Sequence, residues 1–100
     1  MKPVVLSRLA EEELAADKAA YDEQRVGRGK RFALAVRSAL KMIAKHPKAA
    51  TPYRELYRRK VVAKFPYLIF YREYEDRIWV AAIYHAKREP DAWLNRTAED

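Results

Sequence analysis

Two neighbouring apolar stretches decide the fold: residues 67–72, which read YLIFYR, and residues 78–84, which read IWVAAIY. Both are rich in β-branched and aromatic side chains, which favour extended backbone. The residues between them include YEDR at 74–77, which predicts a turn, so the two stretches form a hairpin. Since neither stretch has a polar face, we expect both strands to be central in a sheet and covered on one face by helices.

A weaker strand is predicted before this hairpin, over residues 56–65. Its alternation places two sets of side chains on opposite sides, namely Arg58, Lys60 and Lys64 on one and Arg59, Val61, Ala63 and Phe65 on the other. Pro66 interrupts it. Residues 47–55 contain Pro47 and Pro52 and are expected to form a connector.

Two helices are predicted ahead of the strands. Ser7 suits the N-cap of the first, over residues 8–24, because its hydroxyl can accept a hydrogen bond from a free backbone N–H. Gly27 and Gly29 mark the turn between the helices. The second, over residues 29–45, has apolar side chains at helical spacing, namely Phe32, Val36, Leu40 and Ile43. It ends at His46, because a residue before proline disfavours helical backbone.

Residues 3–6, PVVL, predict a short first strand at or near an edge of the sheet. The predicted order is therefore β-α-α-β-β-β in one α+β domain spanning residues 1–100. Its antiparallel sheet of three to four strands packs against an N-terminal helical hairpin. The tail from about Pro90 is expected to be a short helix or coil.

The composition limits the classes of function. Lys and Arg number 21 against 14 Asp and Glu, a net charge of +7, which favours an anionic partner or serves solubility alone. The absence of cysteine excludes disulfides, thiol nucleophiles and cysteine–metal sites, and we expect neither a metal nor a cofactor. No signal-peptide core or long apolar run is evident, so a cytoplasmic protein that does not enter membranes is expected.

Three stretches together resemble the C-terminal half of ParE-type toxins, the plasmid-stabilisation branch of the RelE/ParE superfamily: residues 65–72, 76–80 and 85–93. The resemblance extends over about residues 2–95 and implies the toxin of a type II toxin–antitoxin system. A small ParD-like antitoxin with an acidic C-terminal region would neutralise it, and operator DNA would be bound only through that antitoxin. ParE-like members poison DNA gyrase, whereas RelE-like members cut mRNA in the ribosome. The fold alone does not choose between these targets.

The resemblance also addresses catalysis. Positions that are basic in the RelE-like nucleases hold Arg58, Lys60 and Arg88, and His85 is the candidate acid or base, with a structural role at the end of its strand as the alternative. Tyr67 stands where those nucleases have an arginine, and Leu94 stands where they have a catalytic tyrosine. We therefore expect a non-catalytic gyrase inhibitor. An endoribonuclease using Arg58, Lys60, His85 and Arg88, or an inactive relative that only binds its antitoxin, are the alternatives.

Residues expected to bind the target or the antitoxin are mostly basic: Arg54, Arg58, Arg59, Lys60, Lys64, Arg72, Lys87, Arg88 and Trp93. The dense run from Arg54 to Lys64 could contact phosphates, meet acidic residues of an antitoxin or of gyrase, or solvate an edge strand. The aromatic residues of the strands are expected mainly in the core. The thin apolar face of the first helix, together with the apolar sheet, predicts a groove for an acidic helix of the antitoxin.

Overall fold

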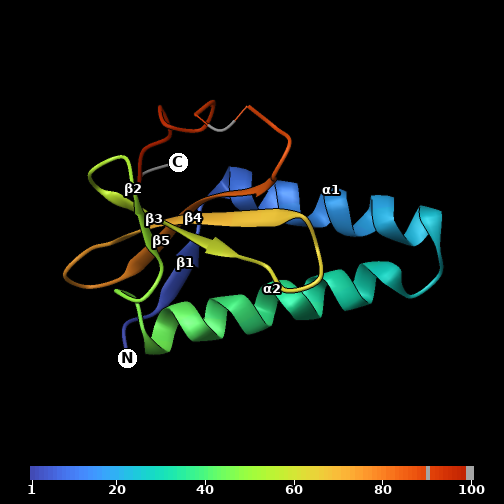
Figure 1. The fold of residues 1–100 in the computed structure, drawn as a ribbon, viewed down its shortest axis with the longest axis horizontal. Helices are drawn as coiled ribbons and strands as arrows, with labels where there is room; N and C mark the ends of the chain where they lie inside the picture. Colours follow the sequence, from blue (N-terminus) through green and yellow to red (C-terminus); the bar gives the residue numbers. More distant parts are fainter. Residues whose placement is uncertain (90, 99–100) are drawn as a thin grey trace.

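A five-stranded sheet with two helices on one face forms the frame of the molecule (Figure 1). A computed structural model of the chain describes residues 1–89 and 91–98. Its elements are β1 (Val4–Leu6), α1 (Arg8–Gln24), α2 (Arg28–Lys45), β2 (Thr51–Tyr53), β3 (Tyr57–Val61), β4 (Tyr67–Glu73) and β5 (Ile78–His85). The strand order is β1-β5-β4-β3-β2, so the two apolar strands are central, as predicted.

The helical hairpin is fixed at its start and at its turn. Ser7 caps α1 as predicted: its Oγ accepts from Ala10 N at 3.0 Å and donates to the Ala81 carbonyl at 3.0 Å. At the turn, Gly27 has a φ of 85°, a left-handed conformation that suits glycine. Gly29 donates its N–H to Asp22 Oδ1 at 2.9 Å, and a Cβ there would lie 2.3 Å from the Lys18 carbonyl oxygen. The two helices therefore pack closely only because residue 29 has no side chain.

A β-bulge in β5 accepts hydrogen bonds from residues 7 and 96, which are far apart in the sequence. Phe70 pairs with Ala82 and Tyr71 with Val80, so Ala81 is the extra residue. The Ala81 carbonyl accepts from Ser7 Oγ at 3.0 Å and from Arg96 Nη1 at 2.8 Å. The bulge thus connects the sheet to the start of α1 and to the C-terminal segment.

The sheet has a hydrophobic cluster on each face. The inner cluster lies between the helices and the sheet and includes Phe32, Val36, Ile69, Tyr71 and Val80. The outer cluster contains Phe70, Trp79, Tyr84 and the fully buried Trp93. Residues 91–95 form turns that place Trp93 over this face, on the side of the molecule away from α2 (Figure 1).

Two predictions about the sheet were incomplete. The predicted connector contains β2, which brings the strands to five. Pro52 is compatible with it because β2 is an edge strand, where a residue without an N–H is tolerated. The sheet is also mixed, because β1 pairs with β5 in parallel while the other pairs are antiparallel. A parallel pair requires a long crossover, which the intervening helices and strands supply.

Candidate functional site: a basic groove beside α2

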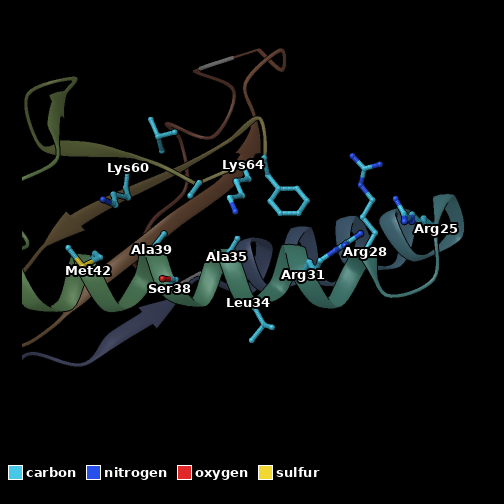
Figure 2. A pocket seen from close by; sticks show the side chains of 13 residues that line it. Arg25, Arg28, Arg31, Leu34, Ala35, Ser38, Ala39, Met42, Lys60 and Lys64 are labelled. Carbon is cyan, nitrogen blue, oxygen red and sulfur yellow. The ribbon is translucent and has the colours of Figure 1, made fainter.

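A groove of about 690 Å³ lies between α2 and the segment that leads from β3 to β4 (Figure 2). Its lining combines basic and apolar side chains, with Ser38 as the uncharged polar member: Arg25, Arg28, Arg31, Leu34, Ala35, Ser38, Ala39, Met42, Lys60, Val61, Ala63, Lys64 and Phe65. No carboxylate is among them.

Regular secondary structure explains how these side chains meet. Arg28, Arg31, Ala35, Ser38 and Met42 follow one another at spacings of three and four, so they form one stripe along α2. Opposite them, Lys60 of β3 pairs with Ile69, a member of the inner cluster, so the lysine side chain lies on the helix side of the sheet. Lys64 follows in a left-handed turn with a φ of 69°.

Five cations line the groove: Arg25, Arg28, Arg31, Lys60 and Lys64. Figure 2 shows Lys60 and Lys64 above α2, with the three arginines toward the hairpin end. Within residues 1–89 and 91–98, the ion pairs include none of these five. Arg28 only stacks on the Tyr21 ring, with Cζ 5.0 Å from the centroid. The groove therefore presents positive charge without an internal counterion.

The apolar part of the groove is exposed to an unusual degree. Leu34 is 51%, Met42 45% and Val61 63% accessible. Large apolar side chains that gather on a surface and are rimmed by polar groups are typical of a binding site for another macromolecule. Charge and exposed apolar surface thus coincide in this groove.

On the α1 side of the hairpin, by contrast, carboxylates neutralise the cations. Glu13 accepts from Arg96 Nη2 at 2.7 Å and from Arg88 Nη1 at 3.3 Å. Its side chain is only 11% exposed and that of Arg96 only 10%. Glu13 also accepts from the Ile83 N–H at 3.2 Å, so it ties α1 to β5 and to the C-terminal segment.

Asp17 lies one turn further along α1, near Tyr67 and His85. Burial raises the pKa of Asp17, while a hydrogen bond from the Tyr67 hydroxyl acts in the opposite direction. Burial and the nearby Asp17 charge raise the pKa of Tyr67. The His85 ring packs edge-on against Tyr67 at 5.3 Å, and its Nδ1 accepts from the Lys87 backbone N–H at 3.1 Å. His85 thus has the structural contacts that the sequence offered as the alternative to catalysis.

The four residues of the nuclease hypothesis do not converge on one point. Arg58 pairs with Tyr71 and donates to the Ala50 carbonyl at 2.8 Å, whereas His85 pairs with Tyr67, four positions away along β4, which is about 13 Å at 3.3 Å per residue. Lys60 lines the groove, and Arg88 faces Glu13 on α1 and stacks on Tyr84 at 4.0 Å. The arrangement separates two basic residues beside α2 from two residues beside α1.

The other predicted binding residues are dispersed as well. Arg54 pairs with Asp91 at 2.6 Å and lowers the pKa of that carboxyl, while Lys87 is exposed. Arg59 and Arg72 lie on the outer face of the sheet, each opposite a member of the outer cluster. Trp93 was expected to bind a partner, which requires a ring on the surface, but it is fully buried.

Sequence reasoning missed Arg25, Arg28 and Arg31. Arg28 and Arg31 are one turn apart on α2, which was the available signal for these two residues. Arg25 is the C-cap of α1 and joins them only through the turn between the helices. Among the described residues, no group of His, Asp and Glu side chains is arranged to hold a metal ion, and no helix is long and apolar enough to cross a membrane.

The arrangement of two helices followed by a strand-rich half has a counterpart in a solved structure, the chromosomal ParDE toxin–antitoxin system of P. aeruginosa. The TM-score is 0.61 at 18% identity, and the match covers 85% of this chain and 96% of that chain. The architecture is therefore of the RelE/ParE type.

The family model for the ParE toxin of the type II toxin–antitoxin system parDE matches residues 4–90. The chain belongs to this family, as its sequence resemblance predicted. No curated protein matches the chain.

Proposed function

We propose that this chain is a growth-inhibiting toxin that acts on DNA gyrase without catalysing a reaction, and that an acidic antitoxin neutralises it by occupying the basic groove. The observation that supports the partner is the groove itself, in which five cations with no ion pair to a described carboxylate rim exposed apolar side chains. The dispersal of Arg58, Lys60, His85 and Arg88 supports inhibition by binding rather than RNA cleavage.

The expected antitoxin segment is an amphipathic helix with acidic flanks. The α2 stripe from Arg28 to Met42 rises about 21 Å at 1.5 Å per residue, which a helix of about four turns can follow. Apolar side chains of the partner would cover Leu34, Met42 and Val61, while its carboxylates would face the arginines and lysines. Such a segment would order as it binds.

Gyrase inhibition is tested by a supercoiling assay with the purified chain, which should reduce supercoiling at micromolar concentration. Unchanged supercoiling, together with an mRNA cut in the ribosomal A site on toeprinting, would replace gyrase by the ribosome as the target. Healthy growth of cells that express the chain alone at good soluble yield would indicate the inactive relative.

The antitoxin site is tested separately, with the small acidic protein encoded beside the toxin gene. Arg31→Glu should weaken its binding about tenfold or more, because a rim cation becomes an anion facing acidic residues. Arg37→Glu makes the same change on an exposed face of α2 outside the groove and is the matched control. Equal losses in the two variants, measured by isothermal titration calorimetry, would reject the groove as the binding site.

A further inference from the structure

The outer face of the sheet has a second basic surface, built from tyrosines and arginines at one end of β2, β3 and β4. We define the tyrosine–arginine face by Tyr53, Tyr57, Tyr74, Arg59, Arg72 and Arg77. The three tyrosines pack against the outer cluster. Arg59 pairs with Phe70 and Arg72 with Trp79, so both arginines lie on that same face.

Guanidinium groups stack on aromatic rings across this face. Arg72 and Arg77 each place Cζ 4.6 Å from the Tyr74 ring centroid, and Arg59 lies 6.0 Å from that of Tyr53. Arg72 also acts on the Tyr57 hydroxyl, whose pKa burial raises and the guanidinium charge lowers. Beneath them, Tyr57 packs edge-on against the buried Trp93 at 4.7 Å, so the rings are supported by the core.

The face is positively charged, and the carboxylates beside it are engaged by other cations or by Arg77. Among the residues that the structure describes, no carboxylate forms an ion pair with Arg59 or Arg72. Arg77 pairs only with its exposed neighbour Asp76, at 2.9 Å. Asp91 is held by Arg54 and Tyr53, while Glu73 binds Lys2 and Lys48. Arg59 and Arg72 are thus available to an anionic ligand.

We infer that the tyrosine–arginine face binds single-stranded nucleic acid. Tyrosine rings and guanidinium planes both stack on unpaired bases, and arginines also contact phosphates. The tyrosines and arginines of this face therefore match the bases and phosphates of a single strand. A duplex keeps its bases stacked within itself and offers these planes no partner. An acidic protein helix would need an exposed aliphatic floor like that of the groove, whereas this face is built from aromatic rings and guanidinium groups.

This inference is independent of the proposed gyrase and antitoxin functions, because the face and the groove share no residue. A partner bound in the groove would leave the tyrosine–arginine face uncovered. The two surfaces can therefore be altered one at a time.

The test measures fluorescence anisotropy of the full chain with labelled 20-nucleotide oligo(dT), oligo(U) and a DNA duplex at low and moderate salt. Arg59→Gln/Arg72→Gln should weaken single-strand binding about tenfold or more and reduce the salt dependence, because two phosphate contacts are lost. Tyr74→Ala should weaken it about fivefold or more through lost stacking. Lys60→Gln/Lys64→Gln removes the same charge from the groove and should change binding less than about threefold.

Arg59→Lys/Arg72→Lys preserves the charge but removes the plane, so an intermediate loss is expected, and it keeps the test informative if the glutamine variant folds poorly. Equal losses in the face and groove variants would reduce the inference to general charge attraction and overturn it. Absence of binding at about 50 μM protein, or duplex binding as tight as single-strand binding, would also overturn it.

Discussion

The two sides of the helical hairpin have the same kinds of charge but use them differently. Beside α1, Glu13 holds Arg88 and Arg96, and its side chain is 11% exposed. Beside α2, five cations share a groove with exposed Leu34, Met42 and Val61, and none of them forms an ion pair with a described carboxylate. We call the α1 side the closed side, because a carboxylate of the same chain neutralises its cations. We call the α2 side the open side, because its cations and apolar side chains are exposed to a binding partner.

The difference shows that positive charge in a sequence is not by itself a binding signal. Arg88 and Lys60 were equal candidates in the sequence, but the fold gives Arg88 an internal carboxylate, whereas no carboxylate of the described residues pairs with Lys60. A cation with a carboxylate beside it already has its charge satisfied within the fold, whereas a cation with no such partner on an apolar groove can contribute binding energy to a ligand.

The largest expected effect comes from breaking the closed side. Glu13→Ala should lower the free energy of unfolding by about 3 kcal/mol, because it removes the carboxylate that accepts two hydrogen bonds from the nearly buried Arg96 guanidinium. Glu12→Ala is the matched control on the same helix, since its pair with Arg8 is exposed and should contribute at most about 0.5 kcal/mol. Urea unfolding followed by circular dichroism measures both. Similar losses in the two variants would mean that the closed side is no more stabilising than an exposed pair.

A smaller effect concerns the pH dependence of the same side. The pKa of Asp17 is raised above its ordinary value of 3.8 by burial, so the folded state holds the proton more tightly than the unfolded state. The contribution of Asp17 to stability is therefore complete below pH 3.8 and is lost as the pH rises through the raised pKa. Asp17→Asn cannot ionise and lacks this dependence.

The stability of the wild type relative to Asp17→Asn should accordingly fall as the pH rises from about 3.8 toward neutrality. Urea titrations of both proteins across this range measure the difference, and Glu12→Gln on the exposed face of α1 controls for a general change of charge. A relative stability that increases with pH would contradict the assignment of burial as the main influence on Asp17.

The smallest expected effect is on the open side. Arg31→Glu should change the free energy of unfolding by no more than about 0.5 kcal/mol, because Arg31 is exposed and has no ion pair among the described residues. The sign should favour the variant slightly, since an acid relieves repulsion in the groove and α2 has no acid in its first turn. Thermal unfolding against Arg37→Glu measures it, and a loss of about 2 kcal/mol would show that Arg31 is structural.

Local patterns were sufficient to predict the helices and the central hairpin. The Ser7 cap, the glycines at 27 and 29 and the apolar stretches at 67–72 and 78–84 each act over a few residues, and the structure confirms each of them. The weak alternation of residues 56–65 also placed Arg58 and Lys60 on one side of the strand correctly. The strand itself ends at Val61, and Phe65, which was predicted on the opposite side, packs against the inner cluster because a turn intervenes.

Features that depend on distant contacts were not predictable in this way. The three residues of β2 form a strand only because β3 is beside them, and no local signal indicates that Trp93 packs on Phe70, Tyr53 and Tyr57. The groove likewise combines α2 with residues 60–65, so the arginines line a groove only when the sheet packs beside the helix. A groove was predicted beside the first helix and the sheet, whereas the groove of the structure lies beside α2. Of the predicted basic run from Arg54 to Lys64, only Lys60 and Lys64 line it.

The sheet cannot be completed until β5 is available to pair with β1. Ser7 and Ala81, which hydrogen-bond at this junction, are separated by 74 positions. During translation β1 therefore has no strand to pair with until most of the chain has left the ribosome. Contacts this distant in sequence also slow folding. A nascent chain thus passes through an interval in which both helices exist while the sheet that supports them is still incomplete.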